Sequence, residues 1–311
     1  MKKICFLITI ISASTFLFGQ KPLVNGDHFA PIQGIIIHYC VRGKGPVCLL
    51  PSPGWGPSIE YLKSTLQPLE KYFTIVYYDT RMSGGSSGPS DTTKYTSKDF
   101  MEEMDSLRVY LHQKKIWLIG HSAGGFQILN YGIHHNDKVN GMIVLDGIAG
   151  EDSLRTAELM KIVSKRKGLP YYQKGMDIYS GKDHTNYSIT EASQILLPFY
   201  FHDSTKMNEF LKLGVIQMSE KAGIYTTAAK FGTEYLFPDL KKITVPTLIV
   251  VGDDDFICDK ISQADRIAKN IPSSSEIVIK NAGHFSWFEQ PKQFLDDCER
   301  WLQKHGIKRQ N

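Results

Sequence analysis

The chain has 311 residues, of which 42% are hydrophobic and 22% are charged, a composition typical of a globular protein with one large core. The formal net charge is +4, and it is +2 without Lys2 and Lys3. Because no basic stripe appears along the chain, we expect no nucleic-acid partner.

Residues 1–20 have the pattern of a signal peptide. Lys2 and Lys3 form a positive start, residues 4–18 are largely apolar, and residues 19–20 form a cleavage zone that lacks the A-x-A pattern. The apolar stretch is short for a membrane span of about 20 residues, so no stable span is expected after leader removal. We therefore expect an exported protein, periplasmic or secreted; the alternative is an uncleaved N-terminal membrane anchor.

Residues 21–149 alternate short apolar strands with helical patterns. Strands are predicted over residues 35–41, 47–50, 73–78, 116–119 and 142–145. Helices are predicted over residues 59–72, 100–111 and 125–131. This alternation predicts an α/β fold, with a mostly parallel, doubly wound sheet covered by helices on both faces.

Residues 150–240 interrupt the alternation, since they are polar, rich in Lys and Tyr, and helical only in pieces, at 153–165 and 207–222. Over residues 241–311 the alternation resumes. Strands are expected at 247–251 and 276–279, and helices at 261–270 and 290–305. We interpret 21–149 and 241–311 as the two parts of one core, and 150–240 as a helical cap over the carboxyl ends of the strands.

The segment from Gly120 to Gly124 has the pattern G-x-S-x-G, between a predicted strand and a predicted helix. A sharp strand-to-helix turn of this kind exposes the side chain of its central residue, Ser122, and glycines let neighbouring backbone pass closely. Because a serine hydroxyl is a weak nucleophile, it needs a general base and a third group that orients the base.

Acidic residues and a histidine follow later strands in the order that such a triad requires. The strand at 247–251 runs into Asp253, Asp254 and Asp255, and Asp146 ends the strand before it. His284 follows the strand at 276–279. His284 is therefore the candidate base, whereas His121 belongs to the turn around the serine.

These motifs resemble the capped α/β-hydrolase superfamily over residues 35–301, and most of all its proline-iminopeptidase-like branch. The segment from Gly283 to Phe294 resembles the ending G-H-x-x-x-x-E-x-P-x-x-F of that superfamily. The resemblance implies an α/β-hydrolase fold with Ser122 as nucleophile and His284 as base. Its Gly-x-x-Asp pattern selects Asp255 as the acid, with Asp254 and Asp146 as alternatives.

A tetrahedral intermediate also needs two N–H donors that form an oxyanion hole. One is expected to be the backbone amide of Ala123. The other should come from the loop after residue 50, where Pro53 has no N–H to donate. Comparison with proline iminopeptidases favours the amide of Gly54, and that of Trp55 is the alternative.

The turn from Tyr78 to Ser86 resembles the superfamily's D-x-R-G-x-G-x-S turn, although Met82 replaces a glycine. We interpret this turn as structural. An ion pair between Asp79 and Arg81 is expected to brace the loop near the mouth of the site.

The sequence thus predicts an exported serine hydrolase that cleaves a small carboxylic ester or related acyl bond, without metal or organic cofactor. The alternative is a proline-iminopeptidase-like aminopeptidase on short peptides, although the chain lacks the His-Gly-Gly-Pro-Gly and Gly-Gly-Ser-Trp-Gly motifs. A complete triad argues against a third reading, a non-catalytic binding protein. An aminopeptidase needs cap carboxylates for the substrate ammonium group, and the candidates are Glu151, Glu158, Glu191, Glu209, Glu220 and Glu234.

Overall fold

The structure is a computed structural model that describes residues 23–310. The leader predicted over residues 1–20 lies outside these residues. Within residues 23–310, no helix combines the length and the apolar character needed to cross a membrane.

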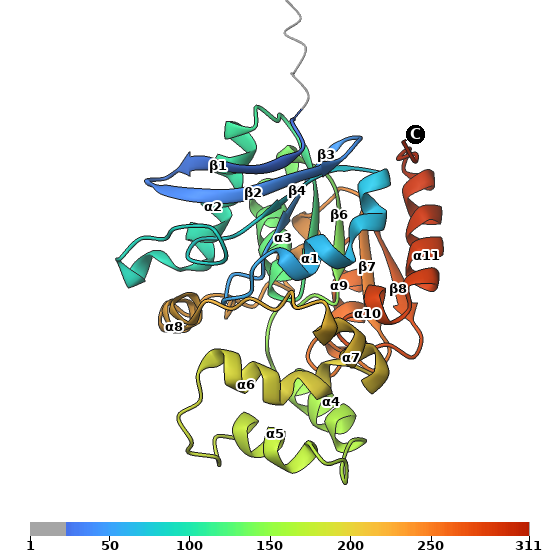
Figure 1. Cartoon of the computed structure of the whole chain (residues 1–311). Coiled ribbons are helices and arrows are strands. Elements are labelled where there is room, and N and C mark those ends of the chain that lie inside the picture. Colours follow the sequence, from blue (N-terminus) through green and yellow to red (C-terminus); the bar gives the residue numbers. More distant parts are fainter. Residues whose placement is uncertain (1–22, 311) are drawn as a thin grey trace, which may run out of the picture.

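The core of the molecule is an eight-stranded sheet with the order β1-β2-β4-β3-β5-β6-β7-β8 (Figure 1). Its strands are β1 (Gly26–Ile32), β2 (Ile35–Gly43), β3 (Val47–Pro51), β4 (Thr74–Tyr78), β5 (Ile116–His121), β6 (Val139–Leu145), β7 (Thr247–Gly252) and β8 (Ser274–Ile279). β2 pairs antiparallel with both β1 and β4, and all the other pairs are parallel. The predicted α/β fold with a mostly parallel sheet is confirmed.

Helices cover both faces of the sheet because successive strand residues point to opposite sides. In β7, Ile249 and Val251 pack into one apolar cluster, whereas Leu248 and Val250 pack into the other. The first cluster is closed by α2 (Ser97–Tyr110), α3 (Ala123–His134) and α9 (Asp265–Asn270). The second is closed by α1 (Glu60–Thr65), α10 (Ser286–Glu289) and α11 (Pro291–Lys304).

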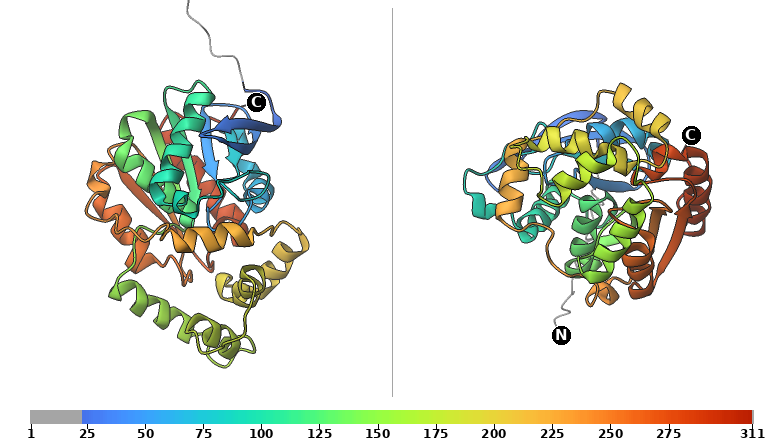
Figure 2. Two further views of the ribbon diagram at one scale, coloured as in Figure 1. Left: turned by 90° about the vertical axis from the view of Figure 1, so that its left-hand side faces the viewer. Right: turned by 90° about the horizontal axis from the view of Figure 1, so that it is seen from below.

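Between β6 and β7 the chain forms a layer of helices, which we call the cap. Its helices are α4 (Ser153–Ser164), α5 (Tyr172–Tyr179), α6 (Ile189–Leu196), α7 (Ser204–Lys212) and α8 (Glu220–Ala228). They lie together at one end of the sheet (Figure 1), and the view from below shows them in front of the core (Figure 2). Leu159, Val163 and Phe199 form a small apolar core that packs against Phe256 of the loop after β7.

Two predicted helices are broken in the structure, each for a local reason. The helix expected over 59–72 is α1 followed by a 3₁₀ turn at Gln67–Lys71, because Pro68 lacks the N–H that would continue an α-helix. The helix expected over 207–222 is replaced by α7 and α8. Gly214 between them has φ +62°, a left-handed conformation that ends a helix.

The sequence pattern did not predict strand β1. Pro31 within this strand argues against a central position, since proline lacks the N–H for a ladder hydrogen bond. The structure resolves the conflict by placing β1 at the edge of the sheet, where β2 is its one partner among the described strands.

The expected Asp79–Arg81 ion pair is wrong. Asp79 accepts hydrogen bonds from the amides of Ile59 and Gly85, at 2.8 and 2.9 Å, and it contacts the ring of His38. Arg81 is buried and pairs with Glu103 of α2, with 2.9 Å between Nε and Oε2. Burial raises the pKa of Glu103 to about 7, and the charge of Arg81 opposes that shift. The turn is therefore braced through α2.

Replacing Arg81 by Met should leave Glu103 buried without its charged partner. We expect the free energy of unfolding at pH 7 to fall by about 3 kcal/mol in urea titrations. The matched control is Lys98→Met, which breaks the exposed Lys98–Glu102 pair of the same helix and should cost less than about 0.5 kcal/mol. Equal losses in the two variants would contradict this account of the turn.

Candidate active site

The three residues predicted as a triad follow strands of the parallel part of the sheet. Ser122 follows β5, Asp255 lies three residues after β7, and His284 follows β8. Parallel strands present their carboxyl ends at one edge of the sheet, so these loops meet at the edge that the cap covers. Ser122 and His284 line the same pocket there.

Ser122 occupies a strained turn between β5 and α3. Its φ of +56° and ψ of −123° are unusual for a residue with a side chain, and its amide donates to the carbonyl of Leu145 at 3.1 Å. The turn needs glycine at Gly120, where a Cβ would lie 2.3 Å from the carbonyl oxygen of Gly124. A second close approach falls at Gly125, whose Cβ would lie 2.9 Å from Cα of Gly147.

Asp255 and His284 are in direct contact, with 2.8 Å between Oδ2 and Nδ1. Both side chains are almost fully buried, with exposed fractions of 0% for Asp255 and 3% for His284. The other carboxylate oxygen of Asp255, Oδ1, accepts the amides of Ile257 and Cys258 at 2.9 and 3.1 Å. The carboxylate is thus held in one orientation, and it fixes Nδ1 of His284 as the N–H donor and leaves Nε2 for chemistry.

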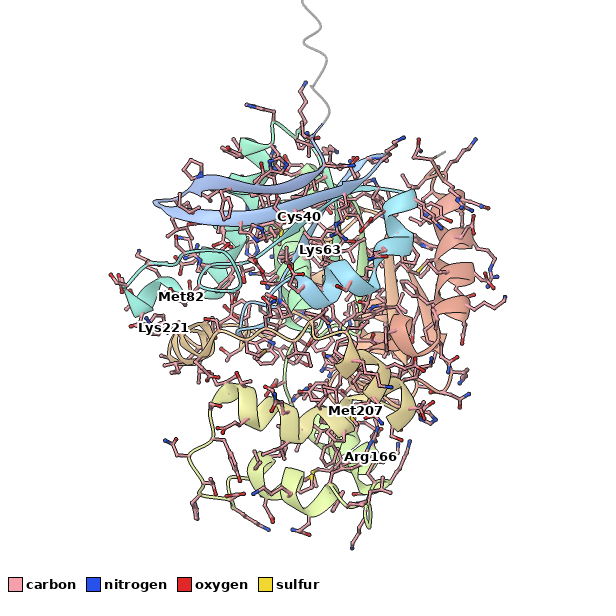
Figure 3. All side chains as sticks on the ribbon, viewed as in Figure 1. Cys40, Lys63, Met82, Arg166, Met207 and Lys221 are labelled. Atoms are coloured by element: carbon pink, nitrogen blue, oxygen red, sulfur yellow. The ribbon has the colours of Figure 1, made fainter. Side chains whose placement is uncertain are left out.

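The alternative acid Asp254 has other partners. Its carboxylate pairs with Arg166, Lys165 and His202 of the cap, at 3.0, 3.4 and 3.1 Å. Arg166 lies in the cap (Figure 3). Asp254 therefore ties the cap to the core, and the structure does not bring it to His284.

The alternative acid Asp146 is fully buried behind the site. Its Oδ1 accepts the amide of Gly252 at 2.8 Å, and its Oδ2 accepts the hydroxyl of Ser286 at 2.6 Å. Burial, together with the nearby charge of Asp255, raises the pKa of Asp146 well above its usual value. Both carboxylate oxygens of Asp146 are thus engaged by Gly252 and Ser286, and the structure does not bring Asp146 to the ring of His284.

His121 is hydrogen-bonded at both ring nitrogens. Nε2 lies 3.0 Å from the carbonyl oxygen of His284, and Nδ1 lies 2.8 Å from the hydroxyl of Tyr61. Burial, and then the neighbouring His284, lower the pKa of His121 well below 6.5. A neutral ring that donates from Nε2 and accepts from Tyr61 satisfies both contacts. The sequence pattern did not predict this role for Tyr61.

The loop after β3 is braced from both sides. Ser52 Oγ is hydrogen-bonded to Thr80 Oγ1 at 2.8 Å, and Gln127 Nε2 of α3 donates to the carbonyl of Ser52 at 3.0 Å. Gly54 has φ +95°, and a Cβ on it would crowd Phe231 and Gln127. Trp55 lines the pocket, and Gly54 is buried beside it. Ala123 is the first residue of α3, so its amide has no acceptor within that helix.

The pocket between cap and core has a volume of about 380 Å³ and is mostly apolar. Its cap side comes mainly from α6, from the 3₁₀ turn at Leu197–Tyr200 and from the segment before α8. The lining residues from the cap are Ile189, Ala192, Ser193, Gln194, Leu196, Leu197, Tyr200, Phe210, Ile216, Gln217 and Met218. Trp55, Tyr61 and Phe285 complete the apolar wall on the core side.

No aspartate or glutamate lines this pocket among the residues that the structure describes. The six cap glutamates that an aminopeptidase would draw on have partners elsewhere. Three pair with lysine or arginine: Glu151 with Arg155, Glu158 with Lys161 and Glu209 with Lys206. The others accept hydrogen bonds from backbone or hydroxyl groups: Glu191 at Ser188, Glu220 at Ile189 and Thr190, and Glu234 at Ser97.

Asp255, Cys258 and His284 have potential metal-ligand atoms within 4.8 Å of one another, the one such group in residues 23–310. Their chemistry does not fit a metal centre. Burial raises the pKa of the Cys258 thiol well above its usual value, whereas a metal requires the thiolate. The facing atoms of Asp255 and His284 already bond to each other.

The profile of the alpha/beta hydrolase fold family matches residues 48–291. The chain is 26% identical to a proline iminopeptidase of Saccharolobus solfataricus over 288 residues, which cover 89% of this chain and 92% of the relative. It is 25% identical to a soluble epoxide hydrolase of a Corynebacterium species over 284 residues, which cover 88% of this chain and 96% of that relative.

Among solved structures, an alpha/beta fold family hydrolase from Bacillus anthracis superposes with a TM-score of 0.71 at 17% identity, covering 90% of this chain and 98% of that one. The chain belongs to the α/β-hydrolase family. Its similarity to proline iminopeptidases confirms the resemblance to that branch, and the chain is a hydrolase.

The lowered pKa of His121 predicts a pH dependence of stability. Below about pH 6.5 the unfolded chain binds more protons at this ring than the folded chain does, so stability falls as the pH falls. The loss from this residue approaches about 1.4 kcal/mol per pH unit. His121→Gln should therefore reduce the loss of unfolding free energy between pH 6.5 and 5.

Chemical denaturation at several pH values measures this slope. His184→Gln, at an exposed cap position, is the control and should retain the wild-type slope. A slope in His121→Gln as steep as that of the wild type would show that His121 is not the group responsible.

Proposed function

We propose that the chain is a serine hydrolase that cleaves a small, uncharged carboxylic ester through Ser122, His284 and Asp255. The observation that carries this proposal is the buried 2.8 Å contact between Asp255 and His284, next to a strained serine in one apolar pocket. The serine in its sharp strand-to-helix turn, the base and the acid that orients the base are the parts that acyl transfer requires.

In the proposed reaction, His284 Nε2 takes the proton from Ser122 as its Oγ attacks the ester carbonyl. Asp255 stabilises the imidazolium that forms. The amide of Ala123, with that of Gly54 or Trp55, donates to the oxyanion. His284 then returns the proton to the leaving alcohol, an acyl-enzyme forms on Ser122, and water activated by His284 releases the acid.

The pocket favours substrates without charge. The pocket volume is about 380 Å³. At about 30 Å³ for each heavy atom, the volume of a water molecule in the liquid, the pocket holds roughly a dozen heavy atoms. A charged group in this mostly apolar space would lose its hydration without a partner of opposite charge. We therefore propose a small ester with apolar acyl and alcohol groups as the substrate class.

The second candidate function is that of an aminopeptidase, which the similarity to proline iminopeptidases favours. This function uses the same three residues but must bind a substrate ammonium group. The pocket offers no carboxylate for it among the described residues, so the lining supports an ester substrate. One of the two relatives is named a proline iminopeptidase and the other an epoxide hydrolase, so sequence similarity alone does not determine the activity of this chain.

We also propose that the protein is exported, on the basis of the leader pattern over residues 1–20. Sequencing the N-terminus of protein recovered from outside the cytoplasm tests this proposal. A start close to residue 21 would support a cleaved leader. A start at residue 1 in the membrane fraction would support the N-terminal anchor.

The proposed triad predicts a ranking of variants. Ser122→Ala should abolish labelling by a fluorophosphonate probe and the turnover of 4-nitrophenyl butanoate. Asp255→Asn should lower kcat by about 10³- to 10⁴-fold, because an amide does not stabilise the imidazolium or select its tautomer.

Asp146→Asn is the matched control for the acid. Its amide mimics the protonated carboxyl that burial favours at this position, so kcat should change by less than about tenfold. If Asp146→Asn lost more activity than Asp255→Asn, the acid would be assigned to the wrong strand.

The substrate proposal is tested with 4-nitrophenyl butanoate and proline 2-naphthylamide. We expect kcat/KM for the neutral ester to exceed that for the cationic amide by at least about 100-fold, since an unpaired ammonium group in the pocket costs several kcal/mol. Turnover of the amide without turnover of the ester would replace this proposal by the aminopeptidase.

A further inference from the structure

One short cap segment, residues 200–203, lies directly on the loop that carries His284. The amide of His284 donates to the carbonyl of Tyr200 at 2.7 Å. The Tyr200 ring packs edge-on against the His284 ring, with centroids 5.2 Å apart. At Gly283, a Cβ would lie 2.4 Å from the carbonyl oxygen of Tyr200, so only glycine fits under the cap backbone. The candidate base is therefore in backbone contact with the cap.

Glu289, at the end of α10, bridges this cap segment and the His284 loop. Its Oε1 accepts the amide of Gly283 at 2.6 Å. Its Oε2 accepts the amides of His202 and Asp203, both at 2.9 Å. Glu289 is only 3% exposed. One buried carboxylate thus binds the loop of the base through one oxygen and the cap through the other.

The hydrogen-bond partners of Glu289 are all backbone amides; no lysine or arginine pairs with it among the described residues. Burial raises the pKa of Glu289, and the three amides, together with the nearby ring of His202, oppose that shift. Burying a carboxyl group without a cationic partner is costly for a protein. The arrangement therefore favours a role for Glu289 in fixing the backbone that it contacts.

We propose that Glu289 is a positioning residue for His284. By holding the amide of Gly283 against those of His202 and Asp203, it keeps the His284 ring on Asp255 in the pocket that Ser122 also lines, and it makes this placement depend on the cap. The effect on catalysis rests on the proposed function, whereas the effect on the backbone does not. Misplacing a catalytic group by about 1 Å can lower a rate by about 100-fold.

The variant that tests this role is Glu289→Gln, which keeps the size of the side chain. A carboxylate accepts through both oxygens, whereas a glutamine amide has one acceptor and one donor. In either orientation, its NH₂ group faces at least one backbone N–H. We expect kcat for 4-nitrophenyl butanoate to fall by tenfold to about 100-fold, with KM changed less than about threefold. The matched control, Glu102→Gln at an exposed position of α2, should keep both constants.

Hydrogen exchange separates this proposal from the proposed function, because it needs no substrate. In Glu289→Gln, the amides of Gly283, His202 and Asp203 should exchange at least tenfold faster, while those of β7 keep wild-type rates. Kinetic constants are taken at a temperature where circular dichroism shows the variant to be folded. Unchanged exchange at the three amides, or faster exchange with an unchanged kcat, would overturn the positioning role. A wild-type protein without esterase activity would contradict the proposed function and leave the exchange result to decide the backbone role.

Discussion

The hydrogen bond between Asp255 and His284 is the contact around which this end of the molecule is organised. It joins two loops that follow neighbouring parallel strands, β7 and β8, and its length is 2.8 Å. Each partner is held by backbone: Asp255 by the amides of Ile257 and Cys258, and His284 by the carbonyl of Tyr200. Because both side chains are buried, water does not compete for the contact, and the parallel sheet sets its geometry.

The cap does more than cover the pocket. Asp254, next to the candidate acid, binds Arg166 and His202 of the cap, while Glu289, close to the candidate base, binds the amides of His202 and Asp203. The two loops of the candidate triad are thus connected to one cap segment. Substitutions in that segment should affect both the shape of the pocket and the position of the candidate base, because the same residues contact both.

Strong local patterns predicted most of the sheet and the candidate triad. The strand endings before Ser122, Asp255 and His284 were visible in the sequence because apolar runs stop at glycines and acids there. Pairings between distant segments were not visible. Arg81 meets Glu103 instead of Asp79, and Tyr61 meets His121, because packing across the chain decides these contacts. The roles of Asp146 and Asp254 likewise depend on burial and on cap partners, which one sequence does not reveal.

We propose that Ser122 forms an acyl-enzyme with an uncharged ester. Mass spectrometry of the protein after brief incubation with 4-nitrophenyl butanoate and quenching in acid measures this intermediate most directly. We expect a butanoyl group on the peptide that contains Ser122, and no such group in Ser122→Ala. Ester turnover by the wild type with no adduct, or with an adduct on another residue, would contradict the role of Ser122 as nucleophile.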